Sequence, residues 1–379
     1  MKIKLLAALF ATGMLSACGG SSSNDSEPPV ITPPVVAITK DEAMTQLLAA
    51  QADNYILPAY ASFKEQSEEF EQASLAFCSN ANATASDLTI LKDAWLTLSS
   101  SWQFAKAIKM GPESEEFRHF RLQFWPDANN VVRRGVSSLL AAQTIDVNTV
   151  ASLQDGAQGL PALEVLIFNT EEGDSLLFAK DKVERCLAVM AIAENVKNIA
   201  TEIDTLWRSE ATGFAIDFKN GSGEYDTKQA VLEDFITNWF ELIEVIKDNK
   251  INDVKGILLP GSPDKAESNL SLSSFENIKR NFAALEAAYL AGDGYGFDQY
   301  LSDIHENREV NDTILGYFEE INGLLNEMEV PLAEAVEVQN HRDELVTLIN
   351  KIDEFRSYLS TDFIQVTGLN PNFNSNDGD

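Results

Sequence analysis

Apolar residues recur at helical spacing through most of the chain. One stretch places large side chains at intervals of three and four residues: Leu88, Leu91, Trp95, Leu98, Trp102 and Ala105. The same spacing returns over 192–206 and 345–359. It lines up apolar side chains on one face of a helix, which helical bundles bury against one another. Alternating strand patterns and Asn-Gly hairpin turns are missing between the apolar runs, so the sequence predicts an all-α fold.

These patterns set the expected elements. Helices are predicted over 40–57 and 59–78, with Pro58 between them, and over 86–109, 113–124, 128–142, 159–168, 175–209, 226–249, 273–291, 307–328 and 331–360. Ser86 or Asp87 is a candidate N-cap for the third helix. Loops rich in Gly, Pro, Ser and Asn are expected over 213–223 and 258–274. A break near 169–174 divides the chain into two helical bundles, 38–170 and 171–379, with a functional seam between them.

The first residues have the pattern of a lipoprotein signal. Two lysines precede an apolar run, and Leu15-Ser16-Ala17-Cys18 matches a lipobox, which predicts a signal peptide over 1–18 and lipidation of Cys18. The alternative is a simple secreted protein. Residues 19–37 are expected to be a flexible tether. Gly19 after the cysteine resembles Gram-negative lipoproteins sorted to the outer membrane, so we expect an outer-membrane lipoprotein that faces the periplasm and meets the membrane through this anchor.

An exported compartment permits disulfides, and Cys78 and Cys186 are the cysteines that remain after Cys18. We predict that they pair; the alternative is two buried free thiols. The formal net charge of −31 makes nucleic acid an improbable partner, because binding it requires a basic surface. An acidic surface either attracts metal cations or serves only to keep the protein soluble.

An arginine cluster precedes an unusual Phe-Trp-Pro-Asp run. Arg118 and Arg121 lie one turn apart, and Pro126 disfavours a helix at Trp125. The structural interpretation is a rigid corner, held by Trp125 packing and by Asp127, which caps the next helix and pairs with an arginine. The functional interpretation is that the guanidinium groups bind an anionic ligand beside the aromatic wall.

Motifs for catalysis are missing from the sequence. Its three histidines, His119, His305 and His341, form no His-Glu-x-x-His zinc motif. His119 lies between two arginines and is expected at the surface. No Gly-x-Ser-x-Gly nucleophile elbow is present either. No residue is therefore assigned as catalytic.

Two of these segments, with others, resemble the imelysin-like proteins. The resemblance rests on Arg121…Phe124-Trp125-Pro126-Asp127, Gly159-Leu160-Pro161-Ala162-Leu163-Glu164, Glu267-Ser268…Ser271-Leu272 before Asn277 and Asn281, and the closing run over 368–379. It implies an all-helical, two-bundle envelope protein, classed with metallopeptidases and in many members linked to iron uptake.

The family hallmark Gly-x-His-x-x-Glu is incomplete in this sequence. Gly159 and Glu164 match it, but Pro161 stands where the histidine belongs, and proline offers no donor atom to a metal. Glu164 then either binds a cation with carboxylates from other helices, or pairs with an arginine such as Arg121 while Pro161 begins a helix.

The expected function is that of a non-catalytic binding lipoprotein in iron or other metal uptake. Its expected ligand site, at the seam between the bundles, consists of Arg118, Arg121, Trp125, Asp127, Gly159, Pro161, Glu164 and Ser268, with Glu164 as the candidate metal ligand. The cofactor, if any, is iron or another divalent metal, and the partners are a metal or small ligand and envelope transport proteins. The alternatives are an imelysin-type metallopeptidase and a protein-interaction module.

Overall fold

The computed structural model describes residues 38–169 and 176–372. Over these ranges the chain forms helices and no strand, which confirms the predicted all-α class. None of the helices in these ranges is both long and apolar enough to cross a membrane. The predicted signal peptide, the lipidated Cys18, the tether and the last seven residues of the closing motif lie outside the described residues.

The first helix differs from the prediction at Pro58. Helix α1 (Lys40–Ala50) runs through a π-helical stretch (Gln51–Ile56) into α2 (Leu57–Ser79), with helical backbone angles at both junctions. The predicted break at Pro58 is therefore wrong. Pro58 lies in the first turn of α2, where its missing N–H costs little, and the π-helical turn just before it takes up the altered hydrogen bonding.

Helix α3 (Ala85–Ala105) begins one residue earlier than predicted. Its N-cap is Thr84, not Ser86 or Asp87; the Thr84 hydroxyl accepts from the Asp87 N–H, and the Asp87 carboxylate accepts from the Thr84 N–H. The predicted stripe from Leu88 to Ala105 is buried. Helix α3 packs against α2, which also packs along α8 (Lys182–Arg208). The apolar face predicted over 192–206 differs from the structure at its end: Trp207 of α8 is buried, whereas Leu206 is exposed.

The segment between α3 and α8 is broken into short pieces. The helix predicted over 113–124 is wrong: two 3-10 turns (Gly111–Glu113, Glu115–Phe117) precede a short α4 (Arg118–Leu122). Left-handed backbone angles at Glu116 and Phe117 prevent a continuous helix. The pieces that follow are α5 (Val131–Leu140), α6 (Val147–Ser152), a 3-10 turn (Asp155–Ala157) and α7 (Leu160–Phe168).

The remaining chain has more helices than predicted. Helix α9 (Phe214–Asn220) occupies part of an expected loop, and α13 (Phe297–His305) lies in a stretch with no predicted element. The others are α10 (Lys228–Glu244) with a π-helical continuation (Val245–Asn252) and α11 (Asp253–Lys255), a 3-10 turn (Pro263–Lys265), α12 (Ser274–Tyr289), α14 (Arg308–Asn326), α15 (Leu332–Ala335), α16 (Gln339–Tyr358), a π-helical turn (Leu359–Phe363) and α17 (Ile364–Thr367).

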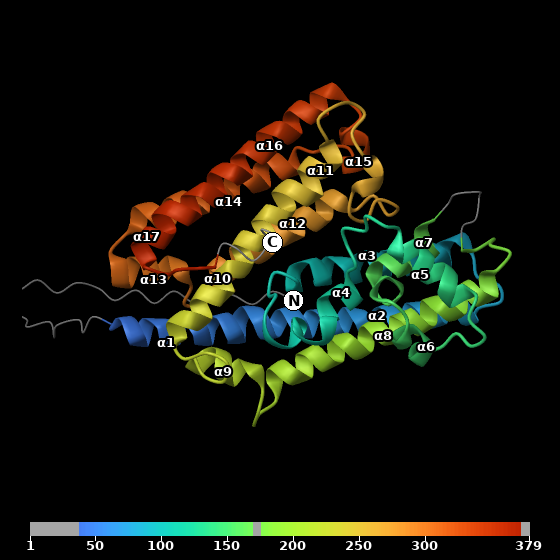
Figure 1. Cartoon of the computed structure of the whole chain (residues 1–379), viewed down its shortest axis with the longest axis horizontal. Coiled ribbons are helices and arrows are strands. Elements are labelled where there is room, and N and C mark those ends of the chain that lie inside the picture. The colour runs from blue at the N-terminus through green and yellow to red at the C-terminus, as the bar shows by residue number, and fades with distance from the viewer. Residues whose placement is uncertain (1–37, 170–175, 373–379) are drawn as a thin grey trace, which may run out of the picture. The chain divides into compact units, whose positions relative to one another are not determined.

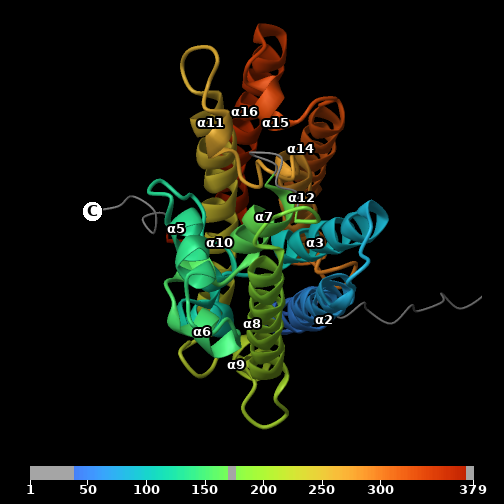
Figure 2. The ribbon, with the colours of Figure 1, turned by 90° about the vertical axis from the view of Figure 1, so that its right-hand side faces the viewer.

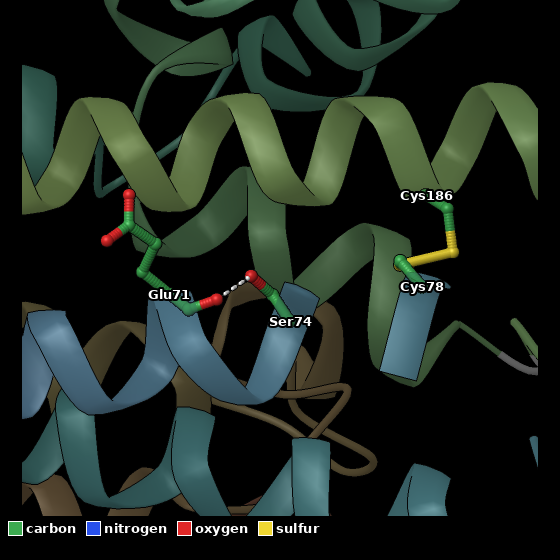
Figure 3. Close-up of a disulfide and its surroundings, with 4 residues drawn as sticks. All are labelled: Glu71, Ser74, Cys78 and Cys186. Atoms are coloured by element: carbon green, nitrogen blue, oxygen red, sulfur yellow. Dashed lines mark hydrogen bonds between the residues drawn. A yellow bond between two sulfur atoms is a disulfide. The ribbon is translucent and has the colours of Figure 1, made fainter. Parts of the chain in front are cut away.

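The predicted disulfide is confirmed. Cys78 at the end of α2 bonds to Cys186 near the start of α8, with their Cα atoms 5.3 Å apart (Figure 3). Further along the same pair of helices, the Glu71 carboxylate on α2 forms an ion pair at 2.6 Å with Lys197 on α8. The Ser74 hydroxyl donates to the Glu71 carbonyl within α2. The bridge thus closes a 108-residue separation across two helices that are already packed together.

Helices α10, α12, α14 and α16 lie together, and α2, α3 and α8 form a second group (Figure 1). Because α8 follows residue 171 but packs along α2, the predicted bundle boundary at 170 does not coincide with a division in the packing. Contact between α3 and α12 joins the two groups, as Figure 2 shows. The loops that precede α5 and α12 lie close to one another.

Candidate functional site

A cavity of about 680 Å³ lies where these loops meet α7. Three segments line most of it: 123–128 between α4 and α5, the first turns of α7, and 264–270 ahead of α12. Its size is within the range of ligand pockets in proteins. Of the eight predicted binding residues, the lining includes Trp125, Asp127, Pro161, Glu164 and Ser268.

Glu164 is the buried acid of this cavity. Only 5% of the residue is exposed, and its Oε1 accepts two hydrogen bonds from Ser271, at 2.8 Å from the backbone N–H and at 2.7 Å from the hydroxyl. Burial raises the pKa of Glu164 to about 7, although the Ser271 donors act in the opposite direction. No ion pair between Glu164 and a basic side chain forms among the described residues.

The local sequence explains how α7 presents Glu164. Gly159 precedes the helix, and a Cβ there would lie 2.4 Å from the Arg121 carbonyl oxygen, so only glycine allows this close approach. Pro161 lies in the first helical turn, as one of the two interpretations of the sequence predicted. The Trp95 indole N–H donates to the Leu160 carbonyl at 3.2 Å and fixes the start of the helix. Gly159 itself does not line the cavity.

The Phe-Trp-Pro-Asp segment forms the facing wall. Asp127 caps α5 by accepting from the Val131 and Val132 N–H groups at 2.7 and 2.9 Å, as predicted. Trp125 is half-buried and does not belong to the buried hydrophobic core. The corner is therefore held by Asp127 and not by packing of Trp125, whose ring lines the cavity.

The structure places Arg118 and Arg121 away from the cavity lining. Arg118 is buried and bonds to the Glu202 carboxylate at 2.9 Å and to the Pro112 carbonyl at 2.8 Å. The Arg121 Nε donates to Gln158 Oε1 at 2.9 Å. The predicted pairs of Arg121 with Glu164 and of either arginine with Asp127 are not formed, because other acceptors are closer.

A buried ionic cluster lies directly behind the cavity. Glu267 lies 2.6 Å from the Lys250 amine and 3.6 Å from that of Lys106, and it accepts from the amides of Gln103 and Gln123 at 3.2 and 3.1 Å. Burial favours the neutral acid, but the two lysine charges outweigh it and lower the pKa of Glu267 to about 2. Burial lowers the pKa of Lys250 to about 8, against the attraction of Glu267.

Two asparagines of α12 complete the cluster. Asn277 donates to Glu267 Oε2 at 3.1 Å and to the Ser268 hydroxyl at 3.0 Å. Asn281 accepts from Lys250 at 2.6 Å and donates to the Gln103 carbonyl on α3 at 2.6 Å. The cluster therefore ties α3 and α12 to Ser268 in the cavity wall.

Sequence reasoning missed three buried polar side chains of this site. Lys250, Lys106 and Gln103 were not predicted, because a single polar residue in an apolar helix carries no pattern that identifies its partner. Gln103 is buried between Trp102 and Phe104 in the sequence, but aromatic neighbours do not by themselves indicate a buried amide. Asn277 and Asn281 were named through the family resemblance and not through their chemistry.

The histidines also lie away from the cavity lining. The surface position predicted for His119 is wrong: its side chain is largely buried, bonds to the fully buried Glu113 and packs against Trp102. The Glu113 carboxylate offsets the neighbouring arginine charges on which the prediction rested. His341 pairs with Glu344 at 3.0 Å on an exposed helix face.

The donor atoms at Glu164 do not make a resident metal site. Over residues 38–169 and 176–372, no three His, Cys, Asp or Glu side chains gather closely enough to hold a metal ion. Glu164 meets the N–H and hydroxyl donors of Ser271 instead of a second ligand, and Pro161 supplies no donor atom. Ligation by Glu164 stays a prediction, and it would require a metal that brings further ligands with it.

Comparisons with known proteins agree with this architecture. The structure resembles that of an imelysin-like protein from Psychrobacter arcticum 273-4, with a TM-score of 0.74 and 22% identity over 89% of this chain and 100% of that chain. It also resembles a protein of Parabacteroides distasonis ATCC 8503 assigned as an iron-regulated protein A precursor, with a TM-score of 0.69 and 16% identity over 86% of this chain and 97% of that chain. None of the curated proteins matches the sequence.

The two likenesses establish the fold, and the sequence establishes the family. The model of the imelysin family, Peptidase M75, matches residues 56–359, a range that contains the cavity and the ionic cluster behind it. With most of its length matched, and with the Gly159 and Glu164 of the hallmark at the start of α7, the chain belongs to the imelysin family.

Proposed function

We propose that this chain is a non-catalytic binding protein of the cell envelope, attached to the outer membrane through Cys18, which takes a ligand into the cavity for iron or other metal acquisition. The observation that carries the proposal is the cavity itself, which joins a buried acid, Glu164, to a half-buried tryptophan outside the core, Trp125. A buried polar group beside an apolar wall is typical of a ligand pocket.

The chemistry of α7 supports binding over catalysis. Pro161 replaces the histidine of the hallmark and lies in the cavity wall, and none of the three histidines of the sequence lines the cavity. A metallopeptidase needs ligands that hold a metal and a base that activates water. Glu164 could act as a metal ligand or as the base, but one side chain cannot do both at once.

The link to metal acquisition rests on the family and on one neighbour. The Parabacteroides distasonis protein is assigned as an iron-regulated protein A precursor, and the lipobox around Cys18 predicts that this chain is exported. We expect a metal to arrive as a complex with ligands of its own, because the cavity offers few.

The experiment is elemental analysis of the mature protein, followed by calorimetric titration with Fe(II), Fe(III), Cu(II) and Zn(II), free and as citrate chelates. Stoichiometric binding that is reduced in Trp125→Ala or Glu164→Gln supports the proposal. A casein cleavage assay with and without chelator runs beside it. Chelator-sensitive cleavage would replace the binding function with the metallopeptidase alternative, and failure of every free or chelated metal to bind would refute a role in metal acquisition.

A further inference from the structure

The charges that face the cavity are mainly acidic. Its lining contains four carboxylates and two basic side chains. The carboxylates are Asp127, Glu164, Asp253 and Asp264, and the basic residues are Arg133 and Lys265. Arg118 and Arg121, which the sequence offered as anion ligands, are bonded elsewhere. The cavity therefore favours a positively charged guest over an anionic one.

Of the four lining carboxylates Glu164 is the buried one, and no basic side chain within 38–169 and 176–372 pairs with it. Asp127 is stabilised by two N–H groups at the start of α5, whereas Asp253 and Asp264 are exposed to water. Glu164 is buried, and its hydrogen-bond donors are uncharged: Oε1 accepts from the N–H and the hydroxyl of Ser271, and the Leu270 N–H also interacts with the carboxylate. A buried carboxylate without a counter-charge is costly, and a ligand cation would remove that cost.

The nearby lysines do not supply this counter-charge. Lys250 and Lys106 lie against Glu267, 2.6 and 3.6 Å from its oxygens, and Lys250 also bonds to Gln103 and Asn281. Glu267 is therefore ionised and adds a negative field at Glu164 from behind the wall.

The aromatic wall fits the same kind of guest. Trp125 and Phe124 line the cavity, and the Trp125 ring forms no aromatic pair within the described part of the chain. The face of an indole attracts cations, and a half-buried ring leaves part of its surface available to a ligand. Aromatic and carboxylate groups around one cavity are the combination that recognises ammonium and guanidinium groups.

We propose that the ligand is an organic cation whose ammonium or guanidinium group pairs with the Glu164 carboxylate while its body lies against Trp125 and Phe124. This inference rests on the proposed binding function and names the class of its ligand.

Three probes with one indole ring and different charges test the proposal: tryptamine, tryptophol and indole-3-acetate. Agmatine adds a guanidinium without a ring. Calorimetry on the mature protein at pH 8 is expected to show binding of tryptamine, with tryptophol and indole-3-acetate at least about tenfold weaker. As the pH falls from 8 to 6, tryptamine should bind more weakly, because Glu164 takes up a proton and loses its charge.

Matched variants separate the cavity acid from general charge. Glu164→Gln and Asp264→Asn each remove one carboxylate from the lining, but Glu164 is buried and Asp264 is exposed. We expect tryptamine affinity to fall at least about thirtyfold in Glu164→Gln and less than about twofold in Asp264→Asn, as for an exposed ion pair. Thermal unfolding of Glu164→Gln checks that the fold is retained, which we expect because a neutral amide is easier to bury than a carboxylate.

Each other result has a defined meaning. Equal affinity for tryptophol or indole-3-acetate that is lost in Trp125→Ala would overturn the cation assignment and leave the binding function standing. Equal losses in Glu164→Gln and Asp264→Asn would also overturn it, since only net charge would then matter. If neither tryptamine nor agmatine binds, the cation assignment fails, and the metal and chelate titrations decide the proposed function separately.

Discussion

The Oε1 atom of Glu164 accepts hydrogen bonds from both the N–H and the hydroxyl of Ser271, a residue 107 positions later in the chain. Glu164 belongs to α7, and Ser271 lies in the loop ahead of α12. One buried carboxylate therefore connects two walls of the cavity that come from distant parts of the sequence. Its ionisation affects both the stability of the fold and the charge that a ligand meets.

Replacing Glu164 by Gln should change how stability depends on pH. Its pKa is about 7 in the folded protein and near 4.5 in an unfolded chain, so the native state holds the proton more tightly. The contribution of Glu164 to stability is therefore full below the unfolded value and falls as the pH rises through about 7. Relative to Glu164→Gln, the wild type should lose about 3 kcal/mol between pH 4 and pH 8.

Urea unfolding of both proteins across this range measures the difference, in which titration of the other carboxylates cancels. Asp264→Asn is the control, since it removes an exposed carboxylate from the same cavity lining. A flat difference for Glu164→Gln as well would show that burial does not raise the pKa of Glu164.

Removing one partner of the buried pair of Lys250 and Glu267 should be strongly destabilising. Each side chain is 1% exposed. In Lys250→Met the buried Glu267 carboxylate keeps Lys106, 3.6 Å away, as its nearby positive charge. We expect a loss of about 3–5 kcal/mol in the free energy of unfolding. The double variant Lys250→Met, Glu267→Gln should lose less than the sum of the single variants, because neither charge is then left without its partner. Additive losses in a double-mutant cycle would mean that the two charges do not interact.

The sequence was sufficient for the fold class and for the long helices, because their apolar stripes at three- and four-residue spacing are buried as expected from Leu88 to Ala105. It was insufficient between α3 and α8. Left-handed angles at Glu116 and Phe117 break the predicted helix there, and neither residue type signals such angles. Short elements such as α6 contain too few turns to show a period.

The candidate site was predicted in part, for a similar reason. Trp125, Asp127, Pro161, Glu164 and Ser268 line one cavity as the motifs indicated. The partners of charged residues were not predictable, because they depend on which distant loop comes closest. Ser271, and not an arginine, donates to Glu164, and Arg118 bonds to Glu202 on α8.

Removing the disulfide should weaken the fold without abolishing it. The Cys78–Cys186 bond spans 108 residues, for which the chain-entropy argument gives about 4–5 kcal/mol. We expect the variant Cys78→Ala, Cys186→Ala to unfold at lower urea concentration with the same helical content, because α2 and α8 also pack along their length. Two free thiols in the unfolded, unreduced wild type would contradict the bridge.

Two tryptophans of the cavity wall should respond differently to truncation. Trp95 is 1% exposed, donates to the Leu160 carbonyl and contacts Phe168, so Trp95→Ala should cost about 3–5 kcal/mol of stability. Trp125 is half-buried and lies outside the core, so Trp125→Ala should cost less than about 1 kcal/mol. Tryptamine binding should nevertheless be lost in Trp125→Ala. If Trp125→Ala were as unstable as Trp95→Ala, Trp125 would be a packing residue and the aromatic wall would have no separate role in binding.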